Sequence, residues 1–181
     1  MALITVAMMV AMMLPSVAPT LLHHHRQLRA TRTPSAWQHT SLLGVGYASV
    51  WSAIGLVLYA INAELPPLAP VALGTLVLCA GALQVSRWKS KQLLRCRETC
   101  AAVAPMSVAT SWRDGCRLGV ACSLSCTAPM AVLLFAGLMD TRVMLLVTAV
   151  ITAERLAPAG ARIARLTGTV AMVAGLSMVM L

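Results

Sequence analysis

Long runs of apolar residues dominate the chain, and short polar connections separate them. Six runs can be marked, and each is predicted to form a membrane-crossing helix, because about 20 consecutive apolar residues span a bilayer. The third and fifth runs are shorter than this length. The predicted helices cover residues 2–22, 41–63, 68–85, 118–139, 143–158 and 163–181. The pattern therefore predicts an all-α fold, a polytopic membrane helix bundle that forms a single domain over residues 1–181.

Composition strengthens this prediction. Hydrophobic residues make up 59% of the 181 positions and charged residues 10%, whereas a soluble domain is roughly half apolar and about a quarter charged. The formal net charge is +9. Because the basic residues lie between the apolar runs, the charge indicates topology and contact with anionic lipid. Aromatic residues make up only 4% of the chain, so stacking platforms for nucleic acid are not expected.

The basic residues are distributed asymmetrically along the predicted bundle. Thirteen of the fourteen lysines and arginines lie in the first, third and fifth connections or at the helix ends next to them, and Arg142 is the exception. The positive-inside rule places those connections in the cytoplasm, with both termini outside. Residues 87–117 then form a cysteine-containing cytoplasmic loop between the third and fourth helices. Whether this loop contains one helix or two, with a turn near Pro105, is left open.

Cysteines are concentrated on the predicted cytoplasmic side. Five of the six fall within 31 positions, and the six are Cys79, Cys96, Cys100, Cys116, Cys122 and Cys126. The cytoplasm keeps thiols reduced, so structural disulfides are not expected. Clustered cysteines in a reducing compartment favour metal binding or redox chemistry.

The spacing of four cysteines predicts a metal site. "CRETC" contains Cys96 and Cys100, and "CSLSC" contains Cys122 and Cys126. In a helix, each pair shares one face. Four thiolates suit Cu(I) or Zn(II), and Met130, one turn further along, adds a thioether that favours Cu(I). The alternative is that these sulfurs only pack, since cysteine is a common buried residue.

Five further residues are weaker candidates for ligands or for groups that support them: Glu154, Cys116, His23, His25 and Met12. An acid next to an apolar interior is costly unless it is paired, so Glu154 needs a partner. We expect a basic group of residues 87–117 or the surroundings of the metal. His23 and His25 follow the first helix, where they form a solvated turn or bind a divalent ion. Met12 is expected to fill gaps between helices, and Cys116 fits either packing or binding.

No catalytic constellation is visible in the sequence, so the chain is not expected to be an enzyme. The nucleophile elbow, the phosphate-binding glycine loop and the H-E-x-x-H zinc motif are all missing. A thiol–disulfide enzyme would more typically show C-x-x-C. A coupled transporter would need intramembrane acids beyond Glu154.

Several motifs together resemble the bacterial family of predicted metal-binding integral membrane proteins, domain of unknown function 2182. They are "AMMLPSVAP" at 11–19, "GYASVW" at 46–51, "QVSRWK" at 84–89, "GVACSLSCTAPM" at 119–130 and "ER" at 154–155. The chain departs from the family pattern at three positions. Ser125 replaces a middle cysteine, Gln92 stands at the first expected loop cysteine, and Arg155 replaces lysine.

The resemblance and the sulfur spacing lead to one functional expectation with one alternative. The chain is expected to be a multi-pass protein of the bacterial inner membrane that binds copper(I), with zinc as the other candidate. It would hold or handle the metal for a membrane-protein partner, in contact with the lipid bilayer and without nucleic acid. The alternative is a non-catalytic accessory or scaffolding subunit of a larger membrane complex, which could itself contain a metalloenzyme.

Overall fold

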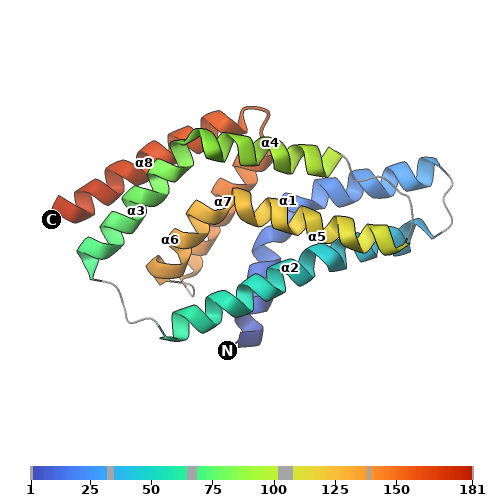
Figure 1. Cartoon of the computed structure of the whole chain (residues 1–181), viewed down its shortest axis with the longest axis horizontal. Helices are drawn as coiled ribbons and strands as arrows, with labels where there is room; N and C mark the ends of the chain where they lie inside the picture. Colours follow the sequence, from blue (N-terminus) through green and yellow to red (C-terminus); the bar gives the residue numbers. More distant parts are fainter. Residues whose placement is uncertain (1, 32–34, 65–68, 102–107, 138–139, 181) are drawn as a thin grey trace. The chain divides into compact units, whose positions relative to one another are not determined.

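The computed structural model describes residues 2–31, 35–64, 69–101, 108–137 and 140–180. These residues are almost entirely helical, and no strand occurs among them, which confirms the all-α class (Figure 1). The described helices are α1 Ala2–Ala30, α2 Ala36–Glu64, α3 Pro70–Val85, α4 Arg87–Ala101, α5 Val108–Ser125, α6 Thr127–Gly137, α7 Thr141–Leu156 and α8 Gly160–Met180.

Several of these helices are long and apolar enough to cross a membrane. Helices α1, α2 and α8 meet that condition individually. The pairs α3–α4 and α5–α6 meet it only when each pair is taken together, and each pair is sharply bent at a short break. The described residues therefore contain three to five candidate spans. The predicted number of six crossings stays a prediction.

The chain forms two compact units. Unit one comprises Met1–Val57 and Arg95–Leu124, and unit two comprises Leu58–Leu94 and Ser125–Leu181. Each unit is described separately below.

In unit one, glycines allow α2 and α5 to pack with their backbones in contact. A Cβ atom at Gly46 would collide with the Trp112 carbonyl oxygen, and one at Gly115 would collide with the Leu43 carbonyl oxygen. Small residues permit this close approach between apolar helices. Figure 1 shows the two helices side by side. Gly119, one turn after Gly115, extends the contact toward Val50.

The helices of unit one extend beyond the predicted apolar runs. Helix α1 continues to Ala30, and α2 begins at Ala36, so the histidines after the first run are helical. The reason is that their polar ends pack on each other. His25 Nδ1 lies 3.2 Å from the Thr40 hydroxyl, and its ring meets the Trp37 ring edge-on. Hydropathy alone does not detect such polar contacts.

In unit two, α3 and α8 pack closely along antiparallel faces that carry glycines. Gly81 lies opposite Gly168, and Gly74 lies opposite Gly175. A Cβ atom at Gly81 would stand 2.7 Å from the Gly168 carbonyl oxygen, too close for any side chain. Helix α6 contacts α3 and α7, and α7 contacts α8. Residues on these four helices therefore share one interior.

Part of the predicted loop 87–117 is helical. Helix α3 ends before Ser86, whose backbone is extended, and the Ser86 hydroxyl accepts a hydrogen bond from the Lys89 backbone N–H at 3.3 Å. This is the geometry of a helix N-cap, and α4 begins at the next residue. The buried face of α4 includes Lys89 and Gln92, which explains why an apolar pattern does not reveal it. Pro105 lies outside the described residues.

Candidate functional site

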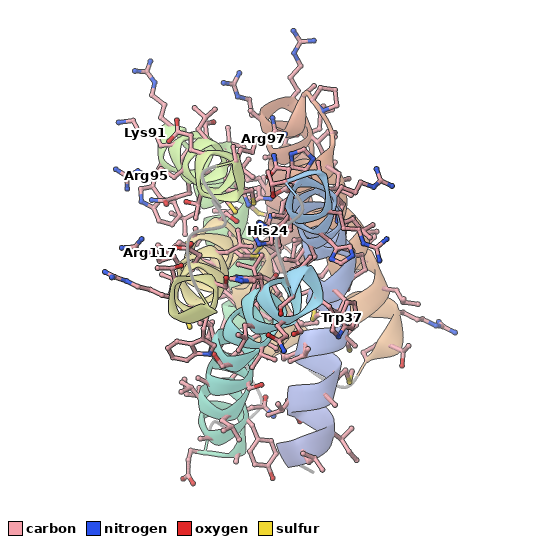
Figure 2. The ribbon with its side chains drawn as sticks, turned by 90° about the vertical axis from the view of Figure 1, so that its right-hand side faces the viewer. His24, Trp37, Lys91, Arg95, Arg97 and Arg117 are labelled. Carbon is pink, nitrogen blue, oxygen red and sulfur yellow. The ribbon has the colours of Figure 1, made fainter. Side chains whose placement is uncertain are left out.

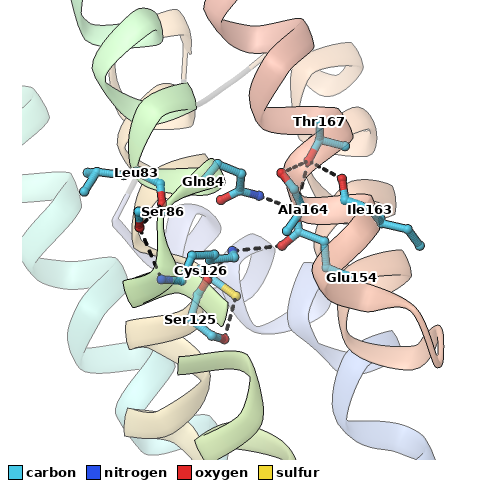
Figure 3. A network of polar contacts seen from close by, with 10 residues as sticks. Leu83, Gln84, Ser86, Ser125, Cys126, Glu154, Ile163, Ala164 and Thr167 are labelled. Atoms are coloured by element: carbon cyan, nitrogen blue, oxygen red, sulfur yellow. Dashed lines mark hydrogen bonds and ion pairs between the residues drawn. The ribbon is translucent and has the colours of Figure 1, made fainter. Parts of the chain in front are cut away.

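A buried ion pair forms the centre of unit two. Lys89 Nζ lies 2.8 Å from Glu154 Oε2, and each side chain is only 2% exposed (Figure 3). Glu154 follows Val147 and Ile151 on the buried face of α7, at helical spacing. Lys89 reaches the carboxylate from α4. Lys89 belongs to residues 87–117, so the basic partner expected for Glu154 is present.

The Glu154 carboxylate also accepts hydrogen bonds from two other helices. Its Oε1 atom accepts from the Gln84 side-chain amide of α3 and from the Thr167 hydroxyl of α8, the latter at 3.2 Å. Burying an isolated charge is expensive, but ion pairing and hydrogen bonds offset much of that cost. The site is therefore built to hold an ionised carboxylate away from water.

Lys89 also binds the backbone at the break between α5 and α6. Its Nζ donates to the carbonyl oxygen of Ser125, the last residue of α5. In an unbroken helix that oxygen would accept from the backbone N–H four residues later, but this position is Pro129, which has no N–H. The proline thus explains both the break at Cys126 and the acceptor that Lys89 uses.

The break changes the surroundings of two predicted ligands. Cys126 lies between the two helices, and its carbonyl oxygen accepts from the Met130 N–H at 3.0 Å. Cys126 Sγ lies 3.7 Å from the Ser125 hydroxyl oxygen (Figure 3). Cys126 is 2% exposed and Met130 8%. The expected continuous helical stripe from Cys122 to Met130 is therefore interrupted, because the chain turns at Cys126.

An apolar cavity borders the ion-pair network. Its volume is about 460 Å³, and its walls come from α3, α6, α7 and α8. Gln84 and Thr167, which donate hydrogen bonds to the Glu154 carboxylate, also line this cavity. Most of the other lining residues are aliphatic. The buried charges are thus surrounded by hydrocarbon on this side.

Unit one contains the other candidate thiols. Cys122 is fully buried on α5, and its Sγ lies 3.3 Å from the Tyr47 hydroxyl of α2. Cys116 donates to the Gly46 carbonyl oxygen at 3.5 Å. Cys96 is buried and Cys100 is half-buried, one turn apart on α4. No disulfide forms among the cysteines, all of which are described.

The predicted ligands are divided between the two units. Unit one contains Cys96, Cys100 and Cys122, and unit two contains Cys126 and Met130. Within the part of the chain that the structure describes, no group of three or more His, Cys, Asp or Glu side chains is arranged to hold a metal ion. The four-thiolate site stays a prediction.

Helix α1 presents buried thioethers on one face. Met9, Met12 and Met13 are each at most 6% exposed, and their spacing of three and four residues places them on one helical stripe. Val17 continues this stripe along the same helix. Met12, predicted as a weak ligand candidate, is therefore part of an apolar, sulfur-rich interior.

The three consecutive histidines of α1 have different surroundings. His23 is exposed, and its Nε2 lies 2.9 Å from the Gln27 amide. His25 bonds Thr40 through Nδ1. His24 lies between them, is 2% exposed, and has no hydrogen-bond partner at either ring nitrogen. Sequence reasoning did not select His24. The sequence feature that indicates its burial is its spacing: His24 lies seven residues, about two helical turns, after Val17 on the buried stripe of α1.

These features define a class of protein: an all-helical chain with apolar helices, free thiols that are mostly buried or half-buried, and buried thioethers. A family model described as PpoB2, copper chaperone, matches residues 3–178. The chain therefore belongs to this copper chaperone family. No curated protein and no solved structure matches the chain. The family match supports the expected association with copper, while the name domain of unknown function 2182 stays a prediction.

Proposed function

We propose that this protein is a membrane-embedded copper chaperone that binds Cu(I) through cysteine thiolates and passes it to a membrane-protein partner. Cys96 and Cys100 capture the ion, and Cys122 and Cys126 hold it, with Met130 as the next ligand. The observation that supports this proposal is the match to the copper chaperone family over residues 3–178, in a chain whose candidate thiols lie largely in its interior.

The chemistry of the donor set favours Cu(I) over Zn(II). Both ions accept thiolates, but thioether sulfur suits the softer cuprous ion. Met130 and the methionine stripe of α1 supply such sulfur away from solvent. Exchange of the ion between neighbouring sulfurs needs no catalytic base. The protein therefore acts by ligand exchange, with copper as its cargo.

In this proposal, the Lys89–Glu154 pair positions the chain around Cys126. Lys89 fixes the carbonyl group that immediately precedes this cysteine, and Glu154 fixes Lys89. Neither side chain is a metal ligand. Their role is to keep the helix break, and with it the Cys126 thiol, in one arrangement.

The proposed location is the bacterial inner membrane. The basic connections face the cytoplasm, as the positive-inside rule requires, and both termini face outward. This orientation puts Cys96 and Cys100 on the cytoplasmic side, where thiols stay reduced.

Elemental analysis of the protein purified from its native membrane tests the proposal. The unmodified chain should retain copper, and the quadruple variant Cys96→Ser/Cys100→Ser/Cys122→Ser/Cys126→Ser should lose it. Cys79→Ser is the matched control, because Cys79 is exposed on α3. This control should retain the metal. A quadruple variant that keeps full copper would show that the thiols do not bind it.

A second candidate function is a non-catalytic accessory or scaffolding subunit of a larger membrane complex. The observation that favours it is that no three His, Cys, Asp or Glu side chains within the described ranges are placed so that they could hold a metal ion. Glycine-lined helix faces would then serve contacts within or between chains. Absence of metal from the unmodified chain, with a stable partner that co-purifies, would support this candidate.

A further inference from the structure

We propose that His24 is a copper ligand, with His39 supplying the second imidazole, in a site of unit one distinct from the cysteine set. This inference rests on the proposed copper-handling function and adds a nitrogen-coordinated station to it. It concerns coordination alone, without electron or group transfer.

The first argument is the burial of His24 without a partner. Buried polar groups are almost always hydrogen-bonded, because leaving one unpaired costs free energy. Within the described part of the chain, three residues have such atoms: His24, Trp51 and Gln84. Trp51 offers only an N–H donor and Gln84 only a hard amide oxygen. His24 alone among them has the nitrogen lone pair that copper binds.

The neighbouring histidines show that this arrangement is specific to one position. His23 and His25 have the same chemistry as His24 but use it in hydrogen bonds to Gln27 and Thr40. Figure 2 shows His24 in the interior, whereas Arg95 and Arg117 extend outward. The structure therefore keeps one of three consecutive imidazoles away from both water and protein partners.

The second argument is the orientation of His39 on α2. His39 is 8% exposed, and its Nδ1 lies 3.0 Å from the Ser111 hydroxyl of α5. A histidine that binds a metal is usually fixed through its other ring nitrogen in this way. The contact leaves Nε2 of His39 as the coordinating atom.

The two imidazoles lie close enough to influence each other. His39 and Asp114 are both within electrostatic range of His24. Helices α1 and α2 run antiparallel here, as the His25–Thr40 bond and the contact of Leu21 with Gly44 show. By this register His24 lies across from residue 41 and His39 across from residue 26, so the two histidines lie within one turn of each other along the helix pair.

Two neutral imidazoles suit a cuprous ion, which accepts two ligands in a linear arrangement and is well matched to imidazole nitrogen. A trio of ligands is not needed. Because neutral nitrogen donors bind Cu(I) less tightly than thiolates, this site would exchange copper readily. It fits a transfer station better than a storage site.

The test uses the full chain in detergent, titrated anaerobically with Cu(I) against the chelator bicinchoninate. In the quadruple cysteine-to-serine variant, a weaker copper site should remain and show nitrogen donors by X-ray absorption. Adding His24→Leu or His39→Leu should weaken it at least about 10-fold, the loss that even indirect changes to metal sites cause. Adding His23→Leu, the matched control, should not.

The outcomes separate this inference from the proposed function. Loss of the tightly held copper in the quadruple variant tests the thiols. The residual nitrogen-coordinated copper tests His24. The inference is overturned if that residual binding is absent or is the same after His24→Leu. His24→Leu removes an unpartnered buried polar group, so the metal-free variant should melt no lower than its parent. If the His24→Leu variant nevertheless fails to fold, two other results test the inference. These are the effect of His39→Leu on copper binding and the nitrogen donors seen in the quadruple cysteine-to-serine variant.

Discussion

The carboxylate of Glu154 is bound by donors from three helices, and this arrangement determines what its replacement would do. In Glu154→Gln the side chain keeps its size but loses its charge, so the buried Lys89 ammonium has no counter-charge. Breaking a buried pair from one side typically costs about 3–5 kcal/mol. We expect a clear loss of thermal stability for the purified protein in detergent, measured by circular dichroism.

The double variant Lys89→Met/Glu154→Leu is the control for that change. Removing both charges leaves no unpaired ion, and apolar replacements of buried pairs are often tolerated. It should therefore recover much of the stability that Glu154→Gln loses. Unfolding of Glu154→Gln at the same temperature as the unmodified protein would contradict the buried pair.

Residue-level chemistry was only partly predictable from the sequence. An acid beside an apolar run must find a partner, so the sequence points to Glu154 and predicts that it meets either a basic group of residues 87–117 or the surroundings of a metal. Neither Lys89 nor His24 could be selected as a buried side chain. Lys89 lies on a helix whose buried face is polar, and the burial of His24 depends on how far α1 extends beyond its apolar run.

At the scale of helices, the α3–α8 contact depends on glycines. The variant Gly81→Leu would force side-chain atoms into the Gly168 backbone, which lies too close for even a Cβ atom. Overpacking typically costs about 1–3 kcal/mol, and rigid backbone neighbours should place this variant at the upper end. Thermal unfolding in detergent measures the loss.

Ala82→Leu is the matched control for Gly81→Leu. It adds the same leucine side chain at the next residue of the same helix, where the position is exposed. Its melting temperature should stay near that of the unmodified chain. Equal effects of the two substitutions would show that α3 does not pack through its glycine face.

Helix type was more predictable than helix continuity. The apolar run 118–139 predicted one helix, yet the chain breaks at Cys126. The signal was Pro129, which deprives the Ser125 carbonyl of its helical donor. Because the run stays apolar on both sides of the break, hydropathy alone does not locate the turn. The Ser125 carbonyl instead accepts a hydrogen bond from the Lys89 ammonium, which lies next to it in the structure but 36 residues earlier in the sequence.

At the scale of the whole molecule, composition predicts apolar helices, and the described residues contain three to five candidate spans. The number of crossings depends on whether each bent pair spans the membrane as one element. Sequence hydropathy averages over such breaks, so it does not determine the number of membrane crossings. The charge distribution is independent of helix continuity, and so it leads to a separate prediction about orientation.

That prediction concerns two exposed glutamates, Glu64 at the end of α2 and Glu98 on α4. Thirteen of the fourteen basic residues lie in or next to the connections assigned to the cytoplasm, which places Glu98 inside and Glu64 outside. With the native cysteines replaced by serine, Glu64→Cys should react with a membrane-impermeant thiol reagent on intact spheroplasts. Glu98→Cys should react only after permeabilisation.

The reverse pattern would invert the orientation and move Cys96 and Cys100 out of the reducing compartment. Reaction of both positions on intact spheroplasts would mean that the chain between them does not cross the membrane to the other side.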